Sequence, residues 1–335
     1  MIRVAIVGAG RMGWIFANAI NELRAEARVS YVVSRSLESA QKMGQYFDCP
    51  YSTELDQALP KIDAVVIAAA TPAHTELALT CANAKKPFFV EKPIADTLEN
   101  GRKIVEATKK NGVQNMVGFH RRFDPAYAAA KQYIEAGNLG SLEVFRSISR
   151  DANMDSSSLE FHLSSGGLIV DLGVHDMDLA RWYMGEVLEV QALGGALTDP
   201  SLAQHGLHDT AVAIIRFESG AFGTVEMARS TAYGHEVRSE ILGALGKVSI
   251  ERDQRGDLKI YNSSGGQFDR PRGFEERFAD AYKAEMKAFV TGIQSQKPLM
   301  PDARDAWYSL RLALAAQEAL QTGKTVQVGQ FGGIL

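Results

Sequence analysis

The first segment that could do chemistry is a GxGxxG pattern at residues 8–13, which reads Gly8, Ala9, Gly10, Arg11, Met12 and Gly13. It lies between a short apolar run and a segment with apolar residues at spacings of three and four, so we expect a strand, a turn and a helix. In such a turn the first glycine permits the bend, the second lets a pyrophosphate approach the backbone, and the third allows close helix–strand packing. The helix N-terminus then offers amide groups to the phosphates. The pattern predicts a dinucleotide site, against the alternative of a plain glycine turn.

The end of the next expected strand indicates which dinucleotide is bound. Enzymes that use NAD usually have an acidic residue there, about 20 residues after the glycines, which accepts a hydrogen bond from the ribose 2′-hydroxyl. This chain instead has Ser34 and Arg35, with no acidic residue before Glu38. A hydroxyl and a guanidinium suit a 2′-phosphate, because arginine supplies charge and several donors. We therefore expect NADP to be favoured over NAD, unless Arg35 is simply a solvated loop residue.

A second reactive segment, Glu91-Lys92-Pro93, follows an apolar run. It places Glu91 and Lys92 at the carboxyl end of an expected strand, where open α/β sheets bind ligands. The simpler alternative is a surface ion pair between the two side chains.

The third reactive segment begins at Ser164-Ser165-Gly166-Gly167 and leads into an expected helix. Asp171 and His175 are four residues apart in it and hence lie on one face. Such a pair can share a substrate hydroxyl, with the carboxylate orienting it and the imidazole exchanging its proton. The alternative is a purely structural pair. Asp178 extends the face, but no fourth ligand follows at a defined spacing, so we expect no metal.

The elements that position these residues alternate between strand and helix over the first 120 residues. We expect strands at residues 2–7, 29–33, 64–69, 88–90 and 115–118, and helices between them, the fourth capped by Asp96 and Glu99. The apolar runs are continuous rather than alternating, which indicates a doubly wound parallel sheet that is covered on both faces.

After Asp124-Pro125, a typical helix start, strands dominate. We expect them at residues 142–149, 188–193, 210–217, 222–228, 237–242, 247–251 and 258–261, with helices at 166–184, 275–295 and 302–321 and a late strand at 325–328. Several alternate apolar and polar residues, as a large, mostly antiparallel sheet with one covered face would. The chain is therefore predicted to be an α/β domain at residues 1–122 followed by an α+β domain at residues 123–335.

Composition excludes several classes of protein. The 335 residues are 46% apolar and 23% charged, with a net charge of −4, so we expect no nucleic-acid partner. No apolar stretch has the roughly 18 residues of a membrane span, and the apolar N-terminus is too short for a signal peptide. Cys49 and Cys81 form no disulfide framework. We expect a cytoplasmic protein.

The combination of Gly8-x-Gly10-x-x-Gly13, Glu91-Lys92-Pro93 and Gly166-Gly167-x3-Asp171-x3-His175 resembles the glucose-fructose oxidoreductase/inositol dehydrogenase/rhizopine-catabolism family. The resemblance runs from residue 1 to about residue 328. Within the family, the segments at residues 117–124 and 233–238 resemble inositol 2-dehydrogenases. The family resemblance implies a Rossmann domain, a C-terminal domain whose open sheet packs in dimers or tetramers, and a small polyol or sugar as substrate.

The resemblance also implies roles for individual residues. Lys92, Asp171 and His175 would be catalytic; Thr71, Pro72, His74 and Glu91 would border the cofactor; and Arg121, Tyr233 and Asp151 would contact substrate. His120, which stands where an apolar residue is expected, would join them.

The expected reaction moves a hydride between a ring secondary alcohol of a cyclitol and nicotinamide C4, and it gives a keto-inositol. Alternatives on the same fold are a sugar or dihydrodiol dehydrogenase and an NADPH-dependent ketosugar reductase. A nucleotide-binding regulator without turnover is less consistent with the trio Lys92, Asp171 and His175.

Overall fold

The computed structural model describes the chain except for residues 153–158, 160–162, 164, 252–257, 264 and 334. The described chain divides into two compact units. The first consists of residues 1–123, 280–308 and 335, and the second of residues 124–279 and 309–334. Ser164, part of the glycine-rich segment before Asp171, lies outside the described residues.

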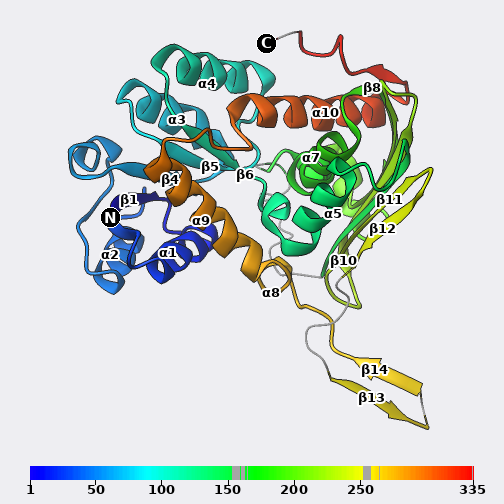
Figure 1. Ribbon diagram of the computed structural model, residues 1–335, viewed down its shortest axis with the longest axis horizontal. Helices are drawn as coiled ribbons and strands as arrows, with labels where there is room; N and C mark the ends of the chain where they lie inside the picture. The colour runs from blue at the N-terminus through cyan, green and yellow to red at the C-terminus, as the bar shows by residue number, and fades with distance from the viewer. Residues whose placement is uncertain (153–158, 160–162, 164, 252–257, 264, 334) are drawn as a thin grey trace. The chain divides into compact units, whose positions relative to one another are not determined.

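The first unit contains a six-stranded parallel sheet of order β3-β2-β1-β4-β5-β6 (Figure 1). Its strands are β1 (Ile2–Val7), β2 (Ala27–Val33), β3 (Tyr51–Ser52), β4 (Ala64–Ile67), β5 (Phe88–Glu91) and β6 (Asn115–Gly118). Its helices are α1 (Arg11–Glu22), α2 (Leu37–Tyr46), α3 (His74–Asn83), α4 (Leu98–Asn111) and most of α9 (Ala279–Ser295). Helices α3 and α4 lie on one side of the sheet, and α1, α2 and α9 lie on the other (Figure 1).

Burial explains why these runs form central strands. Every residue of β4 and β5 is buried, as helices on both faces require. The predicted doubly wound parallel sheet is therefore confirmed. Two details differ from expectation. The fourth strand ends at Ile67, although the N–H of Ala68 still donates to the carbonyl oxygen of Val7 in β1 at 2.8 Å. The cap of α4 is Thr97, whose Oγ1 accepts from the Asn100 N–H at 3.2 Å.

The second unit contains a seven-stranded mixed sheet of order β12-β11-β7-β10-β9-β8-β15. Its strands are β7 (Leu142–Ala152), β8 (Val187–Gly195), β9 (Thr210–Phe217), β10 (Phe222–Thr231), β11 (Glu236–Gly243), β12 (Gly246–Ile250) and β15 (Val326–Gln327). All neighbours pair antiparallel except β7 and β10, which run parallel. The expectation of a large, mostly antiparallel sheet is confirmed.

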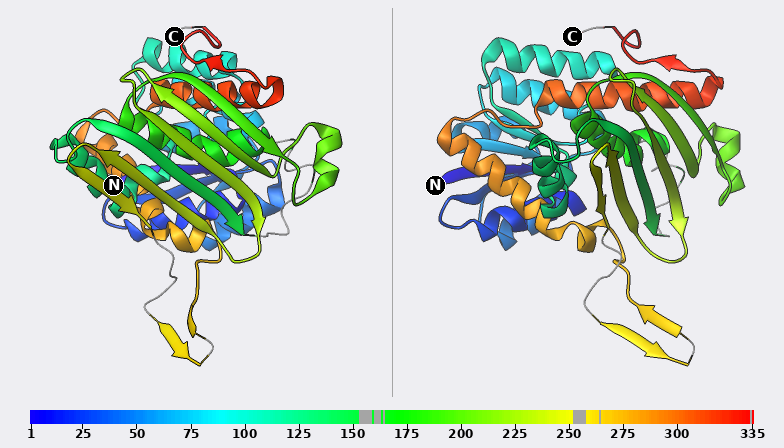
Figure 2. Two further views of the ribbon diagram at one scale, coloured as in Figure 1. Left: turned by 90° about the vertical axis from the view of Figure 1, so that its right-hand side faces the viewer. Right: turned by 45° about the vertical axis from the view of Figure 1, so that its right-hand side comes forward.

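The two faces of this sheet differ in what covers them. Helices α5 (Pro125–Glu135) and α7 (Val174–Met184) lie against one face, here called the inner face. The left panel of Figure 2 shows the opposite, outer face, which no described helix of this unit covers. The expected helix at residues 166–184 is two structures: a π-helical turn at Ile169–Gly173 leads into α7.

The remaining elements are a short helix α8 (Phe274–Arg277), the long helix α10 (Ala303–Thr322) and a two-stranded hairpin. The hairpin, β13 (Lys259–Asn262) and β14 (Gly265–Phe268), projects from the seven-stranded sheet (Figure 1).

Candidate active site

The glycine turn between β1 and α1 is built so that two of its glycines pack and one stays open. Gly8 has a φ of +107°, and a Cβ there would lie 2.6 Å from the carbonyl oxygen of Ala68. A Cβ on Gly13 would lie 1.9 Å from the Gly8 carbonyl oxygen. At Gly10, by contrast, no atom of the described residues lies within 4 Å of the corresponding position.

This turn fits a dinucleotide. Open space at Gly10 is what an approaching pyrophosphate requires. No side chain of the described residues caps the N-terminus of α1, and helix N-termini bind phosphate oxygens through their amide groups. Arg11 is exposed and Met12 is half-buried beside them.

The segment after β2 holds the residues expected to read the ribose. Ser34 is half-buried and Arg35 is exposed. Ser36 is the N-cap of α2, where its Oγ accepts from the Ser39 N–H at 3.2 Å. Arg35 thus directly precedes a capped helix start.

The loops after β4 and β5 carry the next group of candidates. A single 3-10 turn at Thr71–Ala73 holds Thr71 and Pro72 and leads directly into His74, whose ring is buried. Glu91 ends β5, and its Oε2 accepts the backbone N–H of Lys92 at 2.8 Å. Lys92 itself is half-buried. Because the carboxyl ends of parallel strands share an edge, these residues lie at the same edge as the glycine turn.

The segment after β6 is a 3-10 turn at His120–Phe123 whose first three residues are buried. The ring of His120 stacks against Tyr282 of α9, with centroids 4.6 Å apart. Arg121 is only 3% exposed. Arg122 forms an ion pair with Asp305 at 2.7 Å, which holds this turn in place.

In the second unit, Asp171 lies in the π-helical turn and His175 in the first turn of α7. Asp171 Oδ2 forms an ion pair with Arg229 of β10, whose side chain is 7% exposed. The sequence gives no local signal for this partner, which is 58 residues away. His175 is 6% exposed. Single π-helical turns occur frequently at functional sites, which favours a functional interpretation of this one.

A buried carboxylate fixes α7 directly beside His175. Asp176 is fully buried, and its two oxygens accept hydrogen bonds from Ser147 Oγ at 2.6 Å and Ser149 Oγ at 2.7 Å, both from β7. Ser147 is also 2.9 Å from Ser239 Oγ of β11. These contacts set the rotation of α7 on the inner face, and with it the direction of His175.

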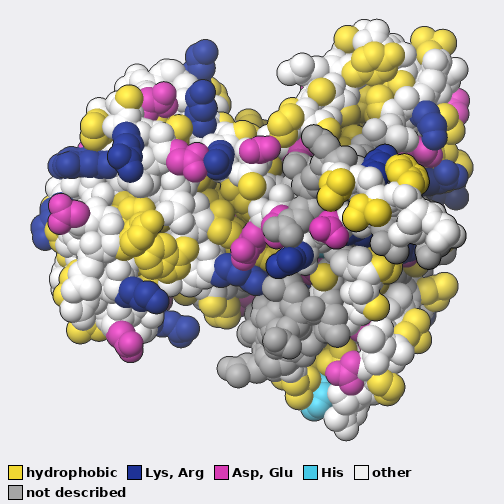
Figure 3. Space-filling model, turned by 90° about the horizontal axis from the view of Figure 1, so that it is seen from below, with side chains coloured by type: hydrophobic (Ala, Val, Ile, Leu, Met, Phe, Trp, Pro, Cys, Tyr) yellow, Lys and Arg dark blue, Asp and Glu magenta, His cyan; other side chains and the backbone are white. Residues whose placement is uncertain are grey.

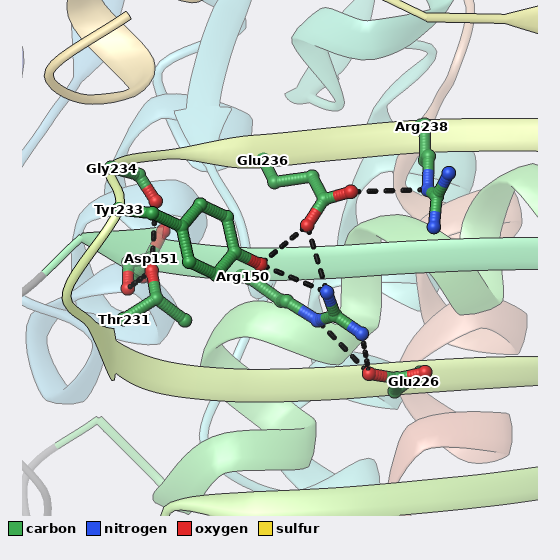
Figure 4. Close-up of polar contacts among 8 residues, drawn as sticks. All are labelled: Arg150, Asp151, Glu226, Thr231, Tyr233, Gly234, Glu236 and Arg238. Atoms are coloured by element: carbon green, nitrogen blue, oxygen red, sulfur yellow. Dashed lines mark hydrogen bonds and ion pairs between the residues drawn. The ribbon is translucent and has the colours of Figure 1, made fainter. Parts of the chain in front are cut away.

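Asp151 and Tyr233 have separate environments. Asp151 Oδ1 lies 3.3 Å from Nδ1 of His235, a ring that is 3% exposed. Tyr233 belongs to the network in Figure 4: its hydroxyl donates to Glu236 Oε2 at 2.5 Å and accepts from Arg150 Nη1 at 2.8 Å. Arg150 also pairs with Glu226.

This network keeps Tyr233 protonated. Partial burial and the hydrogen bond to Glu236 raise the pKa of Tyr233, although Arg150 lowers it. Burial opposes ionisation of Glu236, but the bond from Tyr233 and the charges of Arg150 and Arg238 lower its pKa. Tyr233 is therefore a neutral donor to an ionised carboxylate.

The strand register shows which of these groups share a face. Arg150 of β7 and Glu236 of β11 occupy paired positions, and Glu226 of β10 is paired with Ile148, two residues before Arg150 on β7. All three charged side chains stand on the outer face, where the Tyr233 hydroxyl bonds to Arg150 and Glu236. Asp171 and His175 lie with the helices of the inner face. Arg229, Arg150, Glu226, Glu236 and His235 were not predicted from sequence.

Among the described residues, no group of three or more His, Cys, Asp or Glu side chains is arranged to hold a metal ion. None of the described helices has the length and apolar character of a membrane span. Basic and acidic side chains are interspersed over the face shown in Figure 3.

A parallel sheet of order 3-2-1-4-5-6 with a glycine turn after its first strand defines a dinucleotide-binding protein. The family comparisons narrow this class. A model described as "Oxidoreductase family, NAD-binding Rossmann fold" matches residues 2–119, and one described as "Oxidoreductase family, C-terminal alpha/beta domain" matches residues 131–328. The chain therefore belongs to the glucose-fructose oxidoreductase/inositol dehydrogenase/rhizopine-catabolism family, as its three motifs predict.

Individual relatives match over the whole chain. The scyllo-inositol 2-dehydrogenase (NAD(+)) of Bacillus subtilis (strain 168) is 34% identical, over 98% of this chain and 96% of that protein. The myo-inositol 2-dehydrogenase of Thermotoga maritima is 33% identical, over 99% of this chain and 100% of that protein. A crystal structure of scyllo-inositol dehydrogenase from Lactobacillus casei with bound cofactor NAD(H) and scyllo-inositol matches with a TM-score of 0.93 at 30% identity, over 98% of this chain and 100% of that one.

Proposed function

We propose that this protein is a nicotinamide-dependent cyclitol dehydrogenase that oxidises one ring secondary alcohol of an inositol to the ketone. The observation that carries the proposal is similarity over nearly the full chain to inositol 2-dehydrogenases, including one with NAD(H) and scyllo-inositol bound. The open position at Gly10 and the uncapped start of α1 support the cofactor part of the proposal.

The proposed roles divide the reaction among three side chains. A bound nicotinamide supplies the hydride acceptor. As the C–H bond gives up its electron pair, the hydroxyl proton passes to His175 and the C–O bond becomes a carbonyl. Lys92 stabilises the negative charge that develops on the oxygen. Asp171, held by Arg229, orients the hydroxyl and the imidazole.

Substrate contacts are proposed for the remaining candidates. His120, Arg121, Asp151 and Tyr233 offer donors and acceptors for the other hydroxyls of a polyol. The Tyr233 hydroxyl is already hydrogen-bonded to Arg150 and Glu236, so a substrate would share or replace these bonds. Thr71, Pro72, His74 and Glu91 border the cofactor in this proposal.

The test is the initial rate of absorbance increase at 340 nm with myo-inositol and with scyllo-inositol, each with NAD+ and with NADP+. Turnover of either cyclitol supports the proposal. Turnover only of open or pyranose sugars would instead assign a sugar dehydrogenase, and nucleotide binding without turnover of any polyol would assign a regulator.

For the cofactor, we propose that Ser34 and Arg35 favour the 2′-phosphate of NADP. Arg35 is exposed immediately before α2, and no acidic residue precedes it after β2. The B. subtilis relative is named for NAD(+), so this proposal gives the present chain a different preferred cofactor from the one in that relative's name. Replacing Arg35 by Asp should shift the ratio of kcat/KM for NADP+ over NAD+ downward by at least tenfold, whereas an unchanged ratio would exclude the role.

We also propose how the chain divides its work. Residues 1–122 bind the nucleotide, and residues 123–335 bind substrate and form a homo-oligomer, a dimer or a tetramer. Large apolar side chains stand on the outer face of the seven-stranded sheet, each between 37% and 77% exposed: Leu193, Val212, Ile214, Phe222 and Leu242. Large exposed apolar side chains gathered on one sheet face favour an interaction surface there. The expected cytoplasmic location is a proposal that cell fractionation tests.

A further inference from the structure

His74 is a buried histidine that none of the proposed chemical steps uses. It is the first residue of α3, and its side chain is 1% exposed. Its Nδ1 lies 2.9 Å from the carbonyl oxygen of Pro93, and its Nε2 lies 2.9 Å from the carbonyl oxygen of Ala69. Both ring nitrogens are thus occupied by backbone carbonyls, so the ring acts on its surroundings through two loops.

The first of these loops adjoins the glycine turn. Ala69 follows β4, and the N–H of Ala68 donates to the carbonyl oxygen of Val7 at 2.8 Å. Gly8 packs so closely on this segment that a Cβ there would lie 2.7 Å from the Ala69 nitrogen. A shift of Ala69 would therefore be transmitted to the turn that receives the pyrophosphate.

The second loop carries the proposed catalytic lysine. Pro93 directly follows Lys92, whose N–H is held by Glu91 Oε2 on the other side. The Pro93 carbonyl is buried and reaches the ring of His74, 19 residues earlier in the chain. The backbone at Lys92 is thus held by Glu91 before it and, in the tautomer that carries its proton on Nδ1, by His74 after it.

We propose that His74 is a positioning residue that couples the nucleotide-binding turn to Lys92, an inference that rests on the proposed catalytic role of Lys92. Because the ring contacts two different carbonyl oxygens, those of Pro93 and Ala69, its effects on the two loops can be tested separately. A carbonyl oxygen only accepts, and a neutral imidazole carries one N–H. Burial and, to a lesser degree, Lys92 lower the pKa of His74, although both carbonyls and Asp96 raise it. The neutral ring therefore donates to one loop at a time.

Two conservative variants separate the loops. In His74→Asn the amide nitrogen stands in for Nδ1, so this variant keeps a donor toward Pro93 and loses the one toward Ala69. In His74→Gln the amide nitrogen stands in for Nε2, so this variant keeps a donor toward Ala69 and loses the one toward Pro93. We expect His74→Asn to keep kcat within about fivefold of the native value while its Kd for NADH rises. We expect His74→Gln to keep the native Kd while kcat falls at least tenfold, since small misplacements of catalytic groups can cost 10²-fold. His74→Ala should lose both.

The measurements are steady-state kinetics with the inositol that is turned over and fluorescence titration with NADH. The exposed His205→Asn is the matched control and should leave both quantities unchanged. Thermal unfolding confirms that each variant folds. If the Asn and Gln variants behave alike, whether like the native protein or like His74→Ala, the proposed coupling is wrong.

The titration also separates this inference from the proposed function. If the native protein turns over no polyol, the proposed function fails, but the NADH affinities still test the proposed coupling through His74. A native Kd for His74→Gln with a raised Kd for His74→Asn supports it, and any other order overturns it.

Discussion

Lys92 stands directly after a fully buried strand, and its backbone is anchored by Glu91. An ammonium group placed in this way would stabilise the alkoxide that develops as the hydroxyl proton leaves, and such electrostatic terms are worth about 10²–10³ in kcat. We therefore expect Lys92→Ala to lower kcat at least about 100-fold with a smaller change in the KM for the nucleotide. Initial rates at 340 nm check this, with the exposed Lys103→Ala as control. Near-native turnover would remove Lys92 from the mechanism.

Glu285 is a residue of α9 whose protonation depends on folding. It is fully buried, and neither carboxyl oxygen has a hydrogen-bond partner among the described residues. Burial and, secondarily, the charge of Glu91 raise the pKa of Glu285 well above its ordinary value. The folded state keeps the proton that the unfolded chain releases above about pH 4.3, so stability is lost as pH rises from there toward the folded pKa.

We accordingly expect Glu285→Gln to reduce this loss. The difference in unfolding free energy, variant minus native protein, should increase by up to about 1.4 kcal/mol for each pH unit above pH 4.3. Urea titrations at pH 5, 6 and 7 measure it. Glu218→Gln, at an exposed turn, is the control and should show no such trend. A constant difference across this range would mean that Glu285 is ionised in the folded protein.

At the scale of elements, the glycine turn separates a structural from a functional requirement. Gly13 cannot bear a Cβ, which would lie 1.9 Å from a backbone oxygen, but Gly10 has open space and an ordinary φ of −84°. Gly10→Ala should therefore fold with native stability and lose at least tenfold in NADH affinity, because the methyl group occupies the approach of the pyrophosphate. Fluorescence titration tests this. Gly329→Ala, at a similarly open position, should bind normally. Native affinity of Gly10→Ala would place the nucleotide elsewhere.

The start of α5 combines a cap with a buried ion pair. Asp124 Oδ1 accepts the N–H of Ala126 at 3.0 Å, and Oδ2 pairs with Arg277 Nη1 at 2.8 Å, where both side chains are buried. Asp124→Ala leaves the Arg277 charge without this partner, so we expect a loss of about 3–5 kcal/mol in unfolding free energy. Ser36→Ala, which removes only a cap, should cost about 1 kcal/mol. Equal losses in urea unfolding would show that the ion pair adds nothing.

The same two elements show what sequence can and cannot predict. The cap at Asp124 and the GxGxxG turn were predictable, because each depends on residues a few positions apart. Arg277 and Arg229, the ionic partners of Asp124 and Asp171, were not, since they lie 153 and 58 residues away and no local pattern marks them. The π-helical turn at Asp171 was also missed, because its residues have the same apolar spacing as an α-helix.

At the scale of the whole molecule, alternating strands and helices sufficed to predict the parallel sheet and the mixed sheet after it. The return of the chain to the first unit after residue 279 was not predictable from this alternation. Residues 280–308 belong to the first unit, where Phe289 of α9 packs on Phe89 and Tyr282 packs on Phe16. Apolar spacing shows that a helix has a buried face, but it does not show which of two sheets that face covers.

Assembly is the property of the whole molecule that the outer sheet face makes testable. Ile214 is 51% exposed near the middle of β9, and its paired neighbour on β10 is Thr224, so a charged side chain there would point outward without disturbing the inner core. Burying that charge in an apolar contact without a partner is costly. We therefore expect the native protein to have a multiple of the chain mass in size-exclusion chromatography with light scattering, and Ile214→Arg to be a monomer with unchanged NADH affinity. Tyr133→Arg, on the exposed side of α5, should remain associated. A monomeric native protein would refute the proposed assembly, and an Ile214→Arg variant that stays associated would assign it to another surface.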